Sequence, residues 1–119
     1  MKVKHVYLTA SHPARLAEFY AKAGLSIRFA DGERWIQFRT EGAAFCVSGL
    51  EESASTPSTN AVVVFEVDHL EPVLDRVVAA GATLIAPVRD MGSHGRVAQV
   101  RDPDGNVIQF FEAATKPNE

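Results

Sequence analysis

Few side chains in this sequence of 119 residues are suited to chemistry: it has four histidines and one cysteine. His5 and His94 are candidate general acids or bases, because an imidazole titrates near neutral pH. Cys46 acts as a nucleophile only where a neighbouring base lowers its pKa, and a lone strand cysteine is more often a small buried apolar residue. No Ser or Asp lies at a spacing that indicates a catalytic triad. The sequence therefore leaves open whether the protein is an enzyme.

A second group of residues suits ligand binding rather than bond breaking. The segment Gly92–Arg96 combines glycines with an imidazole and a guanidinium. If this segment closes over a site as a lid, Arg96 can pair with an anionic ligand. A solvated loop is the alternative reading of the same residues.

The elements that must position these residues repeat along the chain. At an offset of 57 residues Ala23-Gly24 aligns with Ala80-Gly81, and both pairs follow an apolar stripe of helical spacing. The closing strands need an offset of 63, which places Cys46 on Gln109. The difference, 63 minus 57, corresponds to six extra residues near 88–96. Strands are predicted at 4–10, 26–30, 33–39, 43–48, 61–67, 83–86, 97–101 and 107–112.

Each copy holds one predicted helix between its first and second strands. Ser11 is the expected N-cap of the first helix, and Pro13 falls in its first turn, where the missing N–H is harmless. The second helix is expected to begin with a capping box formed by Asp68 and Glu71. Each copy is therefore predicted to be a βαβββ unit.

The predicted fold class is α+β, with two βαβββ modules whose mixed sheets form a shared concave cup. Neither module is long enough to close a core alone, so we expect a single domain over residues 1–119. Module one covers residues 2–50, a linker rich in Ser, Thr and Pro covers 51–60, and module two covers 61–113.

The composition argues against several classes of protein. A single cysteine cannot form an internal disulfide. Twelve basic and fifteen acidic residues give a net charge of −3 with no basic run, which argues against a nucleic-acid partner. The apolar runs are too short to span a bilayer, and the N-terminus lacks the pattern of a signal peptide. We therefore expect a cytoplasmic protein with neither a membrane nor a nucleic-acid partner.

Three stretches of the sequence match one family. They are His5-Val6 in the opening strand, Phe19-Tyr20 followed by Gly24-Leu25 at the helix end, and Arg101–Asn106, with its Asp-Pro-Asp-Gly-Asn turn, before the closing strand. The chain resembles the vicinal oxygen chelate superfamily, which contains glyoxalase I, bleomycin-resistance proteins, fosfomycin-resistance enzymes and extradiol dioxygenases. The resemblance covers residues 2–112, and it implies a homodimer.

The resemblance also implies where a metal would bind. In metalloenzymes of the superfamily the ligands come from the first and last strand of each module, which here gives His5, Cys46, Val62 and Gln109. Only His5 matches the family pattern of His or Gln at the strand starts and Glu at the strand ends. Because Val62 has no donor atom and none of the four residues is a carboxylate, we predict no metal or other cofactor. If a metal does bind, its ligands are His5, Cys46 and Gln109.

Alternation along the strands predicts which side chains line the cup. With His5 facing the cup, Tyr7 faces it too, and the central hairpin adds Trp35 and Gln37. Such a lining suits a planar or amphipathic organic ligand, although the same aromatic side chains can also fill a small core or a subunit interface. The predicted ligand-binding residues are His5, Tyr7, Trp35, Gln37, Cys46, Arg96 and Gln109.

Three functions remain open from the sequence. The leading hypothesis is a metal-independent protein, similar to the bleomycin-resistance branch, that binds a small organic molecule and so sequesters a drug or toxin. One alternative is a divalent-metal-dependent lyase, isomerase or dioxygenase of the same superfamily. The other is a metal-free enzyme that uses His5 or His94 as its acid or base.

Overall fold

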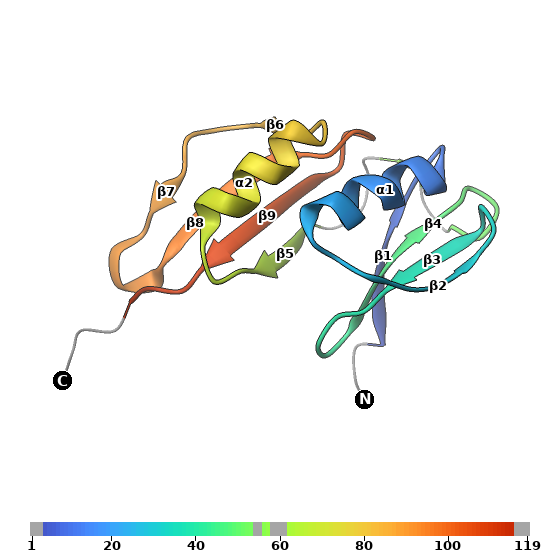
Figure 1. Ribbon diagram of the computed structural model, residues 1–119, viewed down its shortest axis with the longest axis horizontal. Helices are drawn as coiled ribbons and strands as arrows, with labels where there is room; N and C mark the ends of the chain where they lie inside the picture. The colour runs from blue at the N-terminus through green and yellow to red at the C-terminus, as the bar shows by residue number, and fades with distance from the viewer. Residues whose placement is uncertain (1–3, 54–55, 58–61, 116–119) are drawn as a thin grey trace.

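Two sheets, each covered by one helix, make up the fold (Figure 1). The structure is a computed structural model that describes residues 4–53, 56–57 and 62–115. Parts of the predicted linker, residues 54–55 and 58–60, lie outside these ranges, as do residues 2–3 and residue 61 at the starts of the two predicted modules.

The first sheet has the strand order β1-β4-β3-β2. β1 runs parallel to β4, and the other two pairings are antiparallel, so the sheet is mixed. The elements of this module are β1 (His5–Thr9), α1 (Pro13–Ala23), β2 (Ile27–Asp31), β3 (Trp35–Phe38) and β4 (Ala44–Ser48).

The second sheet repeats this arrangement with the order β5-β9-β8-β6, and β5 runs parallel to β9. The six extra residues predicted for this half fall where a short strand, β7, and one turn of 3₁₀ helix over Gly92–His94 precede β8. The elements are β5 (Val63–Glu66), α2 (Leu70–Ala79), β6 (Thr83–Leu84), β7 (Arg89–Asp90), β8 (Arg96–Arg101) and β9 (Val107–Glu112).

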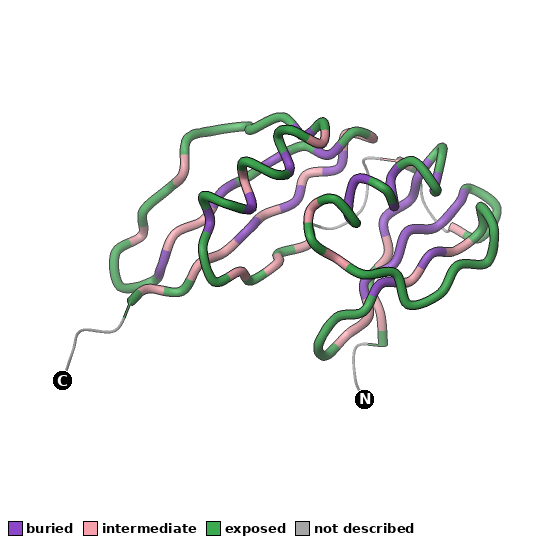
Figure 2. The backbone as a smooth tube through the Cα atoms, in the orientation of Figure 1, coloured by how far each residue is buried: buried purple, intermediate pink, exposed green. Residues whose placement is uncertain are grey.

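Both helices form because apolar side chains recur at helical spacing and bury one side of each helix. In α1 this side includes Leu16 and Tyr20, and in α2 it includes Leu70, Val73 and Val77. Figure 2 shows the buried positions along the inner side of the helices and through the central strands. The apolar residues of the two modules form one continuous core cluster.

The predicted helix caps are wrong. The N-cap residues are His12 and His69 rather than Ser11 and Asp68, and neither histidine makes a side-chain capping bond. The backbone N–H of Leu70 instead donates to the Glu112 carboxylate at 3.2 Å. A carboxylate from the distant end of the chain thus satisfies the helix start, which local spacing alone cannot indicate.

A polar contact ties the two modules together beside their shared core. The Tyr20 hydroxyl on α1 donates to the Asp102 carboxylate at 2.7 Å, and both side chains are buried. Burial, and then the negative charge of Asp102, raise the pKa of the Tyr20 hydroxyl well above its ordinary value of 10.0, so this hydroxyl stays protonated as a donor. The Asp-Pro-Asp-Gly-Asn turn therefore holds module two against module one.

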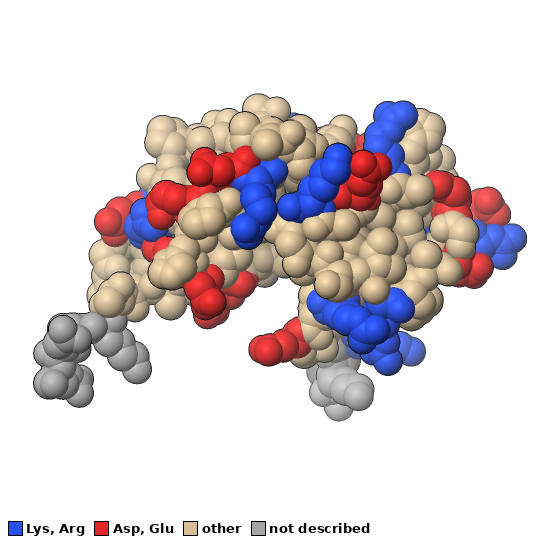
Figure 3. Space-filling view, in the orientation of Figure 1, with Lys and Arg blue, Asp and Glu red and all other residues tan. Residues whose placement is uncertain are grey.

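The two helices lie on the same side of the two sheets, so the helix-free faces of the sheets point in the same direction (Figure 1). The predicted α+β fold class with two βαβββ modules is confirmed. In the described ranges, no helix has the length and apolar character needed to cross a membrane. Figure 3 shows acidic and basic side chains alternating over the helix-bearing face, with one basic group near the lower edge of module one.

Candidate functional site

The helix-free face of the first sheet brings together side chains from three neighbouring strands. The strand register places Cys46 of β4 beside both Tyr7 of β1 and Gln37 of β3. Paired residues of adjacent strands point to the same face, so these three side chains share it. In the next row Trp35 of β3 lies opposite Ser48 of β4. Trp35 and Gln37 therefore share the face of His5 and Tyr7.

His5, Tyr7 and Trp35 form an aromatic cluster on this face. The ring centroids of His5 and Trp35 lie 5.0 Å apart in an edge-to-face arrangement, and those of Tyr7 and Trp35 lie 5.4 Å apart. These separations lie within the range where aromatic rings attract one another. All three side chains are half-buried, so the cluster offers ring surface to solvent.

Gln37 lies next to the aromatic cluster and orients its amide through two weak bonds. Its Oε1 accepts from Trp35 Nε1 at 3.5 Å and from Cys46 Sγ at 3.7 Å. The Gln37 Nε2 has no partner in the described part of the chain. This amide is therefore a hydrogen-bond donor available to a ligand that lies on the rings.

The Cys46 side chain is fully buried in this face, and its thiol has low reactivity. Burial raises the pKa of its thiol from the ordinary 9.0 to about 11. At neutral pH the thiol is therefore protonated, whereas nucleophilic attack and metal binding both need the thiolate. Cys46 contributes shape and a weak donor to the site.

Two features of this face did not emerge from the sequence. Phe29 of β2 pairs with Gln37 and is 48% exposed, which adds a further ring at the edge of the face. Strand alternation could not have found it, because the register shifts between Ile27 and Phe29, so Ile27 pairs with the core residue Phe38 whereas Phe29 pairs with Gln37. The hydroxyl of Ser53, from the start of the predicted linker, makes a short hydrogen bond to the Thr9 hydroxyl and brings that segment onto the face.

Three of the predicted site residues lie in the other module. Gln109 of β9 is opposite Val64 and Gln99 on the second sheet, away from the aromatic cluster. His94 ends the 3₁₀ turn and is exposed. Arg96 begins β8. The structure therefore gathers His5, Tyr7, Trp35, Gln37 and Cys46, and leaves Gln109, His94 and Arg96 apart from them.

Arg96 is engaged by two carboxylates. It donates to both Glu71 oxygens, at 2.8 and 2.9 Å, and its Nε donates to Glu112 at 2.8 Å. These hydrogen bonds lower the pKa of Glu71 and raise that of Arg96. Gly95 is needed here, because a Cβ at this position would collide with the Glu112 carbonyl. The predicted lid is thus tied to α2 and β9, and pairing Arg96 with a ligand would require exchanging these bonds.

Comparison with known proteins identifies the family. A family model described as Glyoxalase/Bleomycin resistance protein/Dioxygenase superfamily matches residues 2–110. The chain belongs to this superfamily. A comparison with curated proteins finds no match.

Solved structures of the superfamily share the fold at low sequence identity. A glyoxalase/bleomycin resistance protein/dioxygenase family enzyme from Burkholderia phytofirmans PsJN is 18% identical with a TM-score of 0.81, over 96% of this chain and 100% of that chain. A glyoxalase-related enzyme from Fulvimarina pelagi is 20% identical with a TM-score of 0.81, over 100% and 93%. Lactoylglutathione lyase from Agrobacterium tumefaciens is 15% identical with a TM-score of 0.75, over 92% of each chain.

The four positions at which the superfamily resemblance implies metal ligands do not fit a divalent ion in this chain. Val62 has no donor atom, the Cys46 thiol is protonated, and Gln109 is a neutral amide on the other sheet. Within the described ranges, no three His, Cys, Asp or Glu side chains gather closely enough to hold a metal. We therefore derive no chemical step through a metal at these positions.

Proposed function

We propose that this member of the glyoxalase/bleomycin-resistance superfamily binds a small planar organic molecule on the helix-free face of its first sheet, without a metal. The aromatic cluster of His5, Tyr7 and Trp35 is the observation that carries the proposal. Half-buried rings around 5 Å apart offer flat apolar surface, and ring stacking attracts a planar ligand. The Gln37 amide beside them supplies a directional hydrogen bond.

The proposal predicts that Trp35 reports on binding. It is the only tryptophan, so its fluorescence comes from this face alone. We expect quinoline, 1,4-naphthoquinone or metal-free bleomycin to change the Trp35 emission saturably, and the change to persist in EDTA. Equilibrium dialysis then measures affinity in variants. Trp35→Ala is expected to weaken binding by at least about tenfold, roughly the contribution of one buried ring.

Phe111→Ala provides the matched control, because Phe111 is a half-buried ring on the helix-free face of the other sheet. Its removal is expected to leave the affinity within about twofold. Equal losses in the two variants, or no saturable binding of any of the three compounds, would contradict a site on the first sheet. Binding that disappears in EDTA would favour the metal-dependent enzyme instead.

We further propose that the protein is a cytoplasmic homodimer in which a second copy covers the open edges of both sheets. Among the described residues, β1 pairs only with β4 and β5 only with β9, so each sheet ends in a strand with an open edge. Val6 beside the first edge and Val62 and Val64 at the second are exposed. Unpaired apolar edges favour association. Sedimentation velocity at micromolar concentration is expected to give a dimer, and a monomer alone would contradict this.

A further inference from the structure

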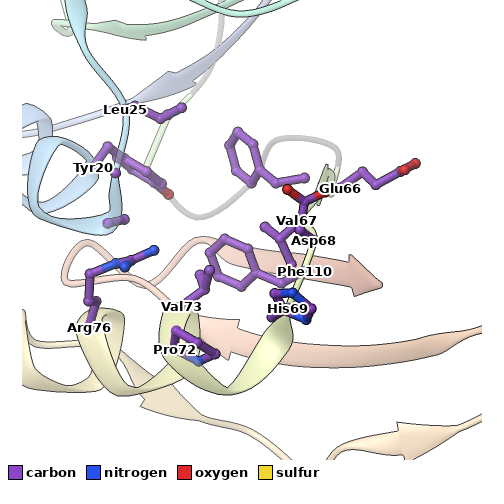
Figure 4. Close-up of a pocket in the computed structure, with 13 residues that line it drawn as sticks. Tyr20, Leu25, Glu66, Val67, Asp68, His69, Pro72, Val73, Arg76 and Phe110 are labelled. Atoms are coloured by element: carbon purple, nitrogen blue, oxygen red, sulfur yellow. The ribbon is translucent and has the colours of Figure 1, made fainter. Parts of the chain in front are cut away.

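A cavity lies on the side of the sheets opposite the aromatic cluster, between the end of α1 and the start of α2 (Figure 4). Its volume is about 440 Å³, which is within the range of small-molecule sites. Its lining includes none of His5, Tyr7, Trp35 or Gln37. This cavity is therefore separate from the site proposed above.

The inner walls of the cavity are apolar. Leu25 borders it from the end of α1, Val73 from α2, and Phe65 and Phe110 from the helix-covered face of the second sheet. Figure 4 shows Leu25 on one side, Pro72 and Val73 on the other, and Phe110 between them. Such walls favour the transfer of a hydrocarbon or ring from water, by roughly 25 cal/mol per Å² of apolar surface.

One cation, the exposed side chain of Arg76, borders this apolar space. Arg76, on α2, extends toward the Tyr20 side of the cavity (Figure 4), and its Nη2 lies 3.9 Å from where a Cβ on Gly24 would be. The Arg76 guanidinium has no hydrogen-bond or ion-pair partner in the described part of the chain. A guanidinium presents paired N–H groups that match a carboxylate. Arg76 is thus positioned to bind one anionic group.

The other end of the cavity carries one carboxylate, that of Asp68, beside the imidazole of His69. Asp68 lies two residues before Leu70, the first residue of α2. Arg76 lies six residues after Leu70, which is about 9 Å along the helix axis. Glu66 also borders this end, and its side chain points away from the cavity (Figure 4). A second negative charge on a ligand would lie near the Asp68 carboxylate and be repelled by it.

We infer that this cavity binds a monocarboxylate with an apolar body, whose carboxylate pairs with Arg76 and whose hydrocarbon packs against Phe65, Val73 and Phe110. The inference goes beyond the proposed function, because it assigns a second site to the opposite face of the sheets.

The test compares three probes of equal chain length: octanoate, octan-1-ol and octanedioate. Binding to the ¹⁵N-labelled protein is followed by NMR. We expect octanoate to bind at least about tenfold more tightly than octan-1-ol or octanedioate, and to shift the amide signals of Gly24, Phe65 and Val73. The Trp35 emission is expected to stay unchanged, so this result and that of the first site are read independently.

Two variants and a matched control test the roles of charge and space. Arg76→Gln is expected to weaken octanoate binding at least about tenfold, and Arg28→Gln, which changes an exposed arginine on β2, to leave it unchanged. Ala23→Leu keeps a strong helix former on α1 while filling part of the cavity, so it should weaken octanoate and octan-1-ol alike. The inference is overturned if octan-1-ol binds as tightly as octanoate, if octanedioate does so, if Arg76→Gln matches Arg28→Gln, or if the shifts map to the aromatic cluster.

Discussion

Asp102→Ala is expected to lower the free energy of unfolding by about 3–4 kcal/mol, because the substitution leaves several buried donors without an acceptor. The Asp102 carboxylate accepts from the Tyr20 hydroxyl at 2.7 Å, from the backbone N–H groups of Asp104 and Asn106, and from the Asn106 side chain. Asp102, Tyr20 and Asn106 are all buried, so water cannot replace these bonds without opening the junction.

Urea unfolding followed by far-UV circular dichroism measures the Asp102→Ala effect. Asp75→Ala is the matched control, because Asp75 is an exposed aspartate on α2, and its change is expected to stay within about 0.5 kcal/mol. Tyr20→Phe removes one of the bonds to Asp102 and should fall between the two. A stability for Asp102→Ala equal to that of Asp75→Ala would show that the turn does not hold the modules together.

Phe45→Ala is expected to lower the free energy of unfolding by about 3–5 kcal/mol and to destabilise both modules together. The Phe45 ring in module one lies 4.9 Å from Tyr20 and 4.9 Å from Phe65, which belongs to module two. Phe65 in turn stacks on Phe110 at 5.8 Å. Removing the Phe45 ring therefore leaves a cavity where the cores of the two modules meet.

Two probes decide whether the modules unfold as one unit. The emission of Trp35 reports on module one, whereas circular dichroism reports on both modules. For Phe45→Ala we expect the unfolding transitions seen by the two probes to shift to a lower urea concentration and to have coincident midpoints. Phe45→Leu refills most of the space, so its free energy of unfolding is expected to fall by less than half as much as that of Phe45→Ala. A circular dichroism transition that stays partly at the wild-type midpoint would contradict a shared core.

The part of the candidate site that the sequence predicted depends on short-range geometry. A strand places alternate side chains on one face, so His5 with Tyr7, and Trp35 with Gln37, follow from spacing alone. The internal repeat then indicated that the first and fourth strands of a module occupy corresponding positions in each half. The position of Cys46 beside Tyr7 depends on the parallel pairing of β1 with β4, which the repeat alone does not indicate.

The remaining features depend on contacts between distant residues. Asp68 and Glu71 have the spacing of a capping box, but Glu112 and Arg96 reach this helix start from β9 and β8 and take the available bonds. Tyr20 and Asp102 are 82 residues apart, and no local pattern connects them. The cavity beside Arg76 likewise exists only because α1 and α2 lie next to each other.

The parallel pairing of β1 with β4 also has a kinetic consequence. His5 pairs with Ala44 across the whole of the first module, so this pairing closes a loop of nearly forty residues, and such non-local contacts form late and slowly. The aromatic cluster draws His5 and Tyr7 from β1 and Trp35 from β3, so it is completed only when that loop closes. The ligand proposed for the cluster would therefore bind only the closed module and slow its reopening, which would protect the opening strand from proteolysis and hydrogen exchange.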